Sequence, residues 1–327
     1  MDNSAPSKLI TATKPKLIDF HPPHADMRAD VLQGLAMPQK ALSPKYFYDE
    51  TGSHLFNDIT LLPEYYLTRT EDSIMLASLD EIAKLVGPRA AVIEFGSGTG
   101  AKIRRLLKHL DEPVACVPVE ISREHLVASA QKLANEHPQL QVIAVHADFT
   151  QPFDLPRISG VQRRLVFFPG STIGNFPHHE AIKLLKVMRQ VADYDGALLI
   201  GADLVKDTQT LEAAYNDSQG VTAAFNLNLL RRINTVLGAD FDLDAFRHIA
   251  IFNRQANRIE MYLESLCKQR VQIGDQVIHF NIGERICTEY AYKYELESFA
   301  EMASAAGFKV QQVWTDPARL FSVQYLV

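Results

Sequence analysis

The feature that most constrains the fold of this chain is an alternation, between residues 90 and 204, of short apolar runs and longer segments of helical character. The first run is AAVIEFG (90–96) and the last is ALLIGADL (197–204). The other three runs are at 115–121, 141–148 and 164–170. Strands that alternate with helices of about 10–15 residues form βαβ units, in which helices cover both faces of a parallel sheet. The sequence therefore predicts an α/β fold with a Rossmann-like sheet.

The alternation stops after Leu204. Residues 207–236 have a helical pattern, and two later segments have a strand pattern with a Gly-Asp turn, at 258–266 and 271–282. Such a stretch does not continue the βαβ series. We therefore expect residues 206–293 to be an insertion that packs on residues 15–69 and forms a second domain of α+β type with them.

The C-terminal segment returns to the pattern of the first domain. A helix is expected at 295–306, and two apolar runs follow it, at 309–316 and 320–327. Two closing strands joined by a short connection favour an antiparallel hairpin. We expect this hairpin to complete the sheet, so that the first domain consists of residues 70–205 and 294–327.

Charge and cysteine usage limit the class of partner. The net charge is −6, whereas a nucleic-acid enzyme normally presents a basic face. The three cysteines, Cys116, Cys267 and Cys287, form no C-x-x-C pair, which argues against a zinc site or a disulfide framework. No segment approaches the ~20 apolar residues of a membrane helix, and the N-terminus lacks a signal-peptide pattern. We predict a cytoplasmic monomer that binds a small molecule, without metal, membrane or nucleic acid.

A glycine-rich motif follows the first strand. It reads Glu94-Phe-Gly-Ser-Gly-Thr-Gly100, with glycines at Gly96 and Gly98 as well, and it opens a helix. In an open α/β sheet, ligands bind at this edge, where glycines let the backbone approach the ligand. Glu120 ends the second strand, where a carboxylate can accept both ribose hydroxyls, and Asp148 ends the third, within reach of an adenine amine. The motif predicts a nucleoside site.

Three interpretations of this motif remain open on the residues alone. Gly96, Gly98 and Ala101 also fit the dinucleotide fingerprint, with Glu120 on the ribose of a nicotinamide cofactor. The G-x-G-x-G spelling, the Asp148-Phe149 pair and the closing hairpin favour a nucleoside that carries a sulfonium group. A structural turn in another α/β protein is the third interpretation.

The chain resembles the histidine-specific methyltransferases of ergothioneine biosynthesis, which trimethylate the α-amine of L-histidine to hercynine. The resemblance covers most of the length and rests on these segments: SPKYFYDETGSHLF (43–56), LPEYYLTRTE (62–71), EFGSGTGAK (94–102), PGSTIGNF (169–176), ADLVKDTQTLEAAYNDSQGVTAAFN (202–226), RIEM (258–261), TE (288–289) and WTDP (314–317). It implies a class I methyltransferase sheet, a second domain that binds the substrate, and S-adenosylmethionine as methyl donor.

The resemblance also implies roles for individual residues. The cofactor contacts would be made by Gly96, Lys102, Glu120, Asp148 and Phe149. The tyrosines near the substrate amine and carboxylate would be Tyr48 and Tyr65. Asn175 would hold the amino acid end of the substrate, and Tyr215 would bind its carboxylate. Glu289 would hydrogen-bond the imidazole, and Met261 would lie beside the ring. We expect Tyr48 to relay the proton of the amine to water.

One position departs from the family pattern. Where the family usually has a serine that completes a second hydrogen bond to the imidazole, this chain has Ala291. The missing contact costs about 1 kcal/mol if water can replace it. Tryptophan or a modified histidine is therefore an alternative acceptor, although a carboxylate at Glu289 argues against a purely apolar side chain.

Each candidate also has a purely structural interpretation. Asn175 could cap the helix that begins near Pro177. Tyr65 and Tyr66 could be core aromatics, Tyr215 could pack between the domains, and Met261 could fill the core. For the whole chain, the rivals to amino acid methylation are a nicotinamide-dependent oxidoreductase and a binding protein without catalysis.

Overall fold

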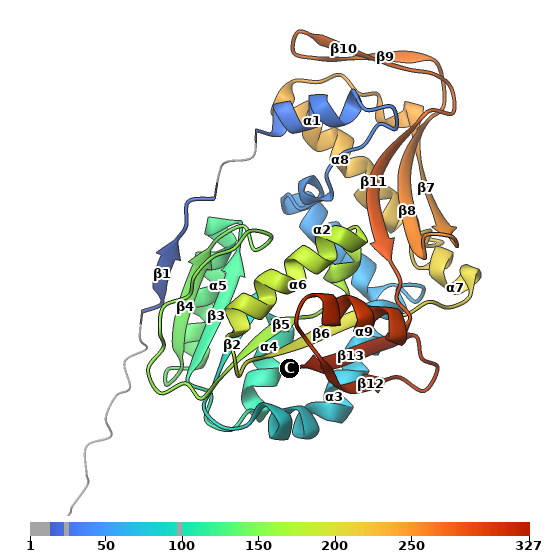
Figure 1. Ribbon diagram of the computed structural model, residues 1–327. Coiled ribbons are helices and arrows are strands. Elements are labelled where there is room, and N and C mark those ends of the chain that lie inside the picture. Colours follow the sequence, from blue (N-terminus) through green and yellow to red (C-terminus); the bar gives the residue numbers. More distant parts are fainter. Residues whose placement is uncertain (1–13, 23–25, 97–99) are drawn as a thin grey trace, which may run out of the picture.

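A computed structural model describes residues 14–22, 26–96 and 100–327 (Figure 1). Its large sheet has eight strands in the order β1-β4-β3-β2-β5-β6-β13-β12. The strands are β1 (Lys16–Asp19), β2 (Ala90–Phe95), β3 (Ala115–Glu120), β4 (Gln141–His146), β5 (Arg163–Phe168), β6 (Ala197–Asp203), β12 (Val310–Thr315) and β13 (Phe321–Leu326).

The topology of the large sheet confirms the predicted fold class. β2 lies between β3 and β5, and the strands from β4 to β6 are parallel. β13 is antiparallel to β6 and to β12, which is the expected closing hairpin. The chain order reverses at β2, because β3 and β4 lie on one side of it and β5 and β6 on the other. The carboxyl end of β2 is therefore the switch point where a ligand binds.

Strand β1 was not expected from the sequence. Its four residues pair in parallel with β4, from Lys16 with Ile143 to Asp19 with His146. The predicted domain division places residues 15–69 in the second domain, whereas this strand extends the large sheet of the first. A run as short as KLID carries too little periodicity to be assigned by pattern.

Helices cover both faces of the large sheet. One face is covered by α3 (Tyr66–Val86), α4 (Ala101–His109) and α5 (Arg123–Glu136), and the other by α6 (His178–Ala192) and α9 (Leu296–Ala305). Alternate strand residues face opposite layers, so Val92 packs with the first set and Ile93 with the second. This arrangement explains why the strands are apolar on both faces.

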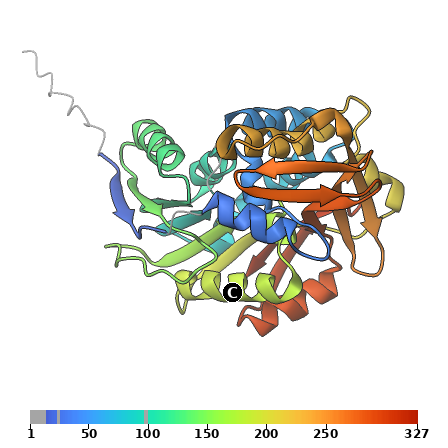
Figure 2. The ribbon, with the colours of Figure 1, turned by 90° about the horizontal axis from the view of Figure 1, so that it is seen from above.

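The second lobe is built around a three-stranded antiparallel sheet, β11-β8-β7. Its elements are α1 (Met27–Leu35), α2 (Glu50–Leu61), α7 (Thr208–Ala213), α8 (Val221–Leu237), β7 (Phe246–Asn253), β8 (Arg258–Ser265), β9 (Gln269–Ile273), β10 (Gln276–Phe280) and β11 (Arg285–Tyr292), with the short helices η1 (Pro44–Phe47) and η3 (Leu243–Ala245). The β9–β10 hairpin and α1 lie together at the top of the molecule in Figure 1, and Figure 2, seen from above, shows them in front of the rest.

The helical prediction for 207–236 was only partly right. The structure divides this segment into α7 and α8, joined by residues 214–220. The carboxylate of Asp217 accepts hydrogen bonds from the backbone N–H groups of Val221 and Thr222, at 2.9 and 2.7 Å. These bonds satisfy the first N–H groups of α8, whose N-cap residue is Gly220, and Tyr215 lies in the connection rather than in a helix.

One apolar core joins the two lobes. It contains Leu79 of α3, Tyr325 of β13, Phe225 of α8 and Leu263 of β8 in a single cluster. In the part of the chain that the structure describes, no helix is both long and apolar enough to cross a membrane.

Candidate active site

The turn after β2 has the backbone that the glycine motif requires. Gly96 has a φ of +71°, and its N–H donates to the carbonyl of Val119 at 3.0 Å. A Cβ at this position would lie 3.7 Å from the ring of Phe149. Gly100, also in the left-handed region, is the N-cap of α4, and Gly98 lies outside the described residues. The two described glycines place the turn and the helix start at the switch point of the sheet.

Two acidic residues follow the next two strands. Glu120 ends β3, and its Oε1 accepts hydrogen bonds from the N–H groups of Ile121 and Ser122 at 2.9 and 3.4 Å. Asp148 follows β4, and its Oδ1 accepts from the N–H and the hydroxyl of Thr150 at 2.9 and 2.7 Å. In both carboxylates one oxygen is engaged by the local loop. Within the described ranges no hydrogen bond involves the second oxygen of either carboxylate, which fits a nucleoside with a ribose and an amine to bind.

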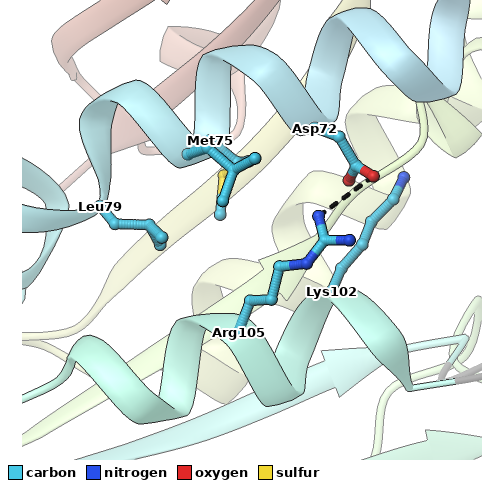
Figure 3. A pocket seen from close by; sticks show the side chains of 6 residues that line it. Asp72, Met75, Leu79, Lys102 and Arg105 are labelled. Carbon is cyan, nitrogen blue, oxygen red and sulfur yellow. Dashed lines mark ion pairs between the residues drawn. The ribbon is translucent and has the colours of Figure 1, made fainter.

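Lys102 connects α4 to α3. Its ammonium group forms an ion pair with Glu71, whose side chain is only 1% exposed, and Glu71 also accepts a hydrogen bond from the N–H of Gly170 at 2.8 Å. Figure 3 shows Lys102 and Arg105 projecting from α4 toward α3, where Arg105 pairs with Asp72 at 3.1 Å. Glu71 thus ties the first turn of α4 to the loop after β5. Glu71 ends the segment LPEYYLTRTE but is not among the residues predicted from the sequence.

A cluster of aromatic side chains lies in the second lobe, close to the carboxyl edge of the large sheet. Tyr65 and Tyr215 have ring centroids 6.2 Å apart, and the ring of Phe56 is 6.4 Å from that of Tyr65. Tyr48 packs edge-on against Phe56 and Phe225, at 5.7 and 5.8 Å. The three predicted tyrosines therefore belong to one cluster, although they come from three separate segments of the chain.

Glu289, Met261 and Ala291 lie on one face of the antiparallel sheet. Glu289 of β11 pairs with Met261 of β8, and Ala291 pairs with Ile259, next to a register shift between Cys287 and Glu289. Residues that are directly opposite share a face, as do residues two apart on one strand. Burial raises the pKa of Glu289 to about 7, and the positive charge of Lys293 opposes this rise.

The electrostatic effects of Glu289 show that it lies near the tyrosines. Burial is the main reason why the pKa values of Tyr48, Tyr65 and Tyr215 lie above their ordinary value, and the charge of Glu289 raises all three further. Tyr48 combines this raised pKa with a side chain that is 45% exposed.

Asn175 is brought to the same region by the short helix η2 (Thr172–Asn175), which packs on β11. The close approach depends on Gly174, where a Cβ would lie 2.7 Å from the carbonyl oxygen of Tyr292. The alternative that Asn175 caps α6 is wrong, because the N-cap residue is Pro177 and no side chain caps the helix.

The polar groups of this cluster lack partners within the protein. Among the residues that the structure describes, none forms a hydrogen bond with the side-chain polar atoms of Tyr48, Tyr65, Asn175 or Glu289; Arg69 donates to Tyr65 only at its backbone carbonyl. Tyr65 is buried and burial raises the pKa of Glu289, and polar groups in such a setting are normally paired, since an unpaired one costs free energy. Tyr48 is 45% exposed and can bond to water. Several such groups around one position indicate a binding site for a small polar ligand.

A buried ionic network adjoins the cluster, and sequence reasoning missed it. Asp203, at the end of β6, is 0% exposed, and it accepts hydrogen bonds from the hydroxyl of Tyr66 and from Lys206 at 2.7 Å. Lys293 pairs with the same carboxylate at 2.8 Å. Of the Tyr65–Tyr66 pair, Tyr66 therefore belongs to this network and Tyr65 faces Tyr215. The position of Asp203 at a strand end was the available signal.

The fold and the site define a class I methyltransferase. The large sheet has the expected strand order with its antiparallel hairpin, and its switch point carries the glycine turn and two acids. A family model described as "Histidine-specific methyltransferase, SAM-dependent" matches residues 27–327, and the chain belongs to this family. Over the described ranges, no group of three or more His, Cys, Asp or Glu residues could hold a metal ion.

Characterised relatives cover nearly the whole chain. It is 40% identical to the histidine N-alpha-methyltransferase of Mycolicibacterium smegmatis over 306 residues, which are 92% of this chain and 94% of that protein. The same identity and coverage hold for the histidine N-alpha-methyltransferase of Mycobacterium tuberculosis. Ergothioneine biosynthesis protein 1 of Neurospora crassa is 29% identical over 82% of this chain, which corresponds to 31% of that longer protein.

Proposed function

We propose that this protein transfers methyl groups from S-adenosylmethionine to the α-amino group of L-histidine and carries the reaction to the trimethylated betaine, hercynine. The observation that carries the proposal is the group of unpartnered polar side chains, Tyr48, Tyr65, Asn175 and Glu289, beside the switch point of the sheet. The names of the two relatives that are 40% identical support the same acceptor.

The cofactor would be held along the carboxyl edge of the large sheet. The free oxygens of Glu120 and Asp148 would bind the ribose hydroxyls and the adenine amine, and Phe149 would pack beside Gly96 against the nucleoside. Lys102 has donors left beyond its ion pair with Glu71, and these suit the carboxylate of the cofactor. When bound, the cofactor supplies a methyl group on a positively charged sulfur.

The substrate would be held by both ends. Asn175 and Tyr215 would bind the amino acid end, while Glu289 would accept a hydrogen bond from the imidazole and Met261 would pack beside the ring. The raised pKa of Glu289 is that of a carboxyl whose charge lacks a partner, and an imidazole N–H is such a partner. This arrangement orients the amine, and orientation is a large part of catalysis in displacement reactions.

The amine must lose a proton before each transfer, because a free α-amine is mostly protonated near neutral pH. The raised pKa of Tyr48 keeps its hydroxyl protonated at neutral pH, so it can pass a proton on to water but does not act as a phenolate base. The rings of Tyr48, Tyr65 and Tyr215 can stabilise the quaternary ammonium product by cation–π attraction.

Mass spectrometry of turnover tests this proposal. The purified protein with S-adenosylmethionine and L-histidine should give products heavier by one, two and three methyl groups, while tryptophan as acceptor should give far less product. No mass gain on histidine would refute the proposal. Faster turnover of tryptophan or of a ring-modified histidine would mean that the same site binds that acceptor instead of histidine. Binding of S-adenosylhomocysteine without binding of NAD would exclude the nicotinamide-dependent alternative.

A further inference from the structure

Lys293 has an unusual position for a lysine. Its side chain is 1% exposed, and it follows β11 at the junction of the two lobes. The ammonium group lies 2.8 Å from Oδ2 of Asp203 and donates a hydrogen bond to the hydroxyl oxygen of Tyr215 at 2.9 Å. A fully buried ammonium is costly unless it is paired, and Asp203 supplies the pairing. The contact with Tyr215 satisfies a second of the three N–H donors of the ammonium group.

The hydrogen bond from Lys293 determines what the Tyr215 hydroxyl can do. An ammonium group can only donate, whereas a tyrosine hydroxyl has one hydrogen and two acceptor sites. When Lys293 occupies an acceptor site of Tyr215, the hydroxyl hydrogen must point away from Lys293. No side chain in the described ranges accepts a hydrogen bond from this hydroxyl, although Tyr215 is buried. The hydrogen is left for a ligand that accepts.

The same contact strengthens the hydroxyl as a donor. A hydroxyl that accepts from a cation is polarised, so it donates more strongly to an anion. Lys206, the other lysine on Asp203, contacts the hydroxyl of Tyr66 and not that of Tyr215. Both lysines therefore pair with Asp203, but only Lys293 contacts the hydroxyl of Tyr215 in the substrate cluster.

We propose that Lys293 is a positioning residue that makes the enzyme select acceptors with a free α-carboxylate, by holding Tyr215 as a one-way hydrogen-bond donor. This inference rests on the proposed function, in which Tyr215 binds the carboxylate of the amino acid. It identifies the acceptor class as free amino acids. Decarboxylated amines and amino acids with an amidated carboxyl group are disfavoured. The former have no acceptor for the Tyr215 hydroxyl, and the neutral amide of the latter accepts a weaker hydrogen bond than a carboxylate.

A mutant cycle on methyl transfer to histidine tests this role. Lys293→Met and Tyr215→Phe should each raise the KM for histidine about tenfold and change kcat by less than about threefold, as expected for the loss of one hydrogen bond to a charged group. The double variant should show no more than the larger single effect, since Lys293 acts through the hydroxyl that Tyr215→Phe removes. The proposal would be overturned if the KM effects of the two single variants multiplied in the double variant. It would also be overturned if kcat fell while KM stayed unchanged.

The matched control is Lys206→Met, which removes the other buried ammonium from Asp203. It should lower the melting temperature to a similar extent but leave the KM for histidine within about twofold. An equal rise in KM would mean that any disturbance of the network has this effect, and would overturn the role of Lys293. If Lys293→Met does not fold, Lys293→Gln replaces it, with retained S-adenosylhomocysteine binding as evidence of a folded cofactor edge.

Inhibition by histamine gives a second readout. Histamine keeps the imidazole and the amine but lacks the carboxylate, so its inhibition constant should be the same for the wild type and for the Lys293 variant. A loss of histamine affinity equal to the loss for histidine would contradict selection for the carboxylate. If the wild type methylates no amino acid, the proposed function itself fails; if it methylates histidine without the KM effect, only the role of Lys293 fails.

Discussion

The cofactor edge and the substrate cluster satisfy their polar groups in opposite ways. At the cofactor edge, Glu120 and Asp148 each have one oxygen held by the following loop. In the substrate cluster, the side chains of Tyr65 and Glu289 have no hydrogen-bond partner among the described residues. The first region is organised before a ligand arrives, whereas the second bears the cost of unpaired groups until one binds. Binding energy at the cluster thus includes the relief of that cost.

The largest effect is expected at the cofactor edge. In the double variant Glu120→Gln/Asp148→Asn, the amide oxygens can still accept from the loops, but the groups that face the ligand become donors. Two charge-assisted hydrogen bonds are lost, so S-adenosylhomocysteine should bind at least a hundredfold more weakly, by about 3–6 kcal/mol. Calorimetry measures this, with Glu124→Gln/Glu301→Gln, which removes two exposed negative charges, as the charge-matched control. Unchanged affinity would remove both acids from the cofactor site.

The second effect tests the cost of an unpaired group in the cluster. The folded pKa of Glu289 is about 7, well above its ordinary value of 4.5, so the folded protein binds this proton more tightly than the unfolded chain. The wild type should therefore lose stability relative to Glu289→Gln as the pH rises from about 4.5 to about 7, by on the order of 3 kcal/mol. Denaturant unfolding without ligand, at pH 5 and pH 8, measures the difference. A constant difference would show that Glu289 is paired.

A smaller effect should distinguish the substrate cluster from the cofactor edge, because it should change the binding of histidine but not that of the cofactor product. Asn175→Ala should raise the KM for histidine about tenfold, because it removes a side-chain amide that has no hydrogen-bond partner in the described part of the chain. Equilibrium binding of S-adenosylhomocysteine should stay within about twofold. A comparable loss of cofactor affinity would place Asn175 at the cofactor edge instead.

The smallest effect concerns the departure from the family pattern. Ala291 is buried on the face that carries Glu289, so Ala291→Ser can restore a hydroxyl toward the imidazole. The KM for histidine should fall about fivefold, equivalent to about 1 kcal/mol. Ala291→Cys, of similar size but a weak hydrogen-bond donor, should leave the KM nearly unchanged. A rise in KM for the serine variant would favour a different acceptor side chain.

The sequence predicted the two regions unequally. Between 90 and 204 the strand ends follow from local periodicity, so Gly96, Glu120 and Asp148 could be placed at one edge of the sheet. The substrate residues come from distant segments, and their grouping came from family resemblance rather than pattern. Their placement in one cluster is now seen in the structure, while their individual roles, the domain boundaries, the monomeric state and the cytoplasmic location stay predictions.

Some elements could not be predicted for identifiable physical reasons. β11 does not alternate simply between polar and apolar residues, because Glu289 faces the cluster while Tyr290 on the other face stacks under Arg258 at 3.6 Å. The ion pair between Asp203 and Lys293 joins residues far apart in the chain, and a buried lysine has no local pattern that distinguishes it from an exposed one. Only the fold brings such groups together.

The apolar core that runs from α3 through α8 to β8 has a consequence for heating experiments. Because no layer of solvent-facing residues divides this core, both lobes should melt in one cooperative transition. A molecule that binds the native form of either lobe should raise the midpoint of that common transition. Thermal shift screening with amino acids would then report on acceptor choice even though the acceptor touches only part of the protein.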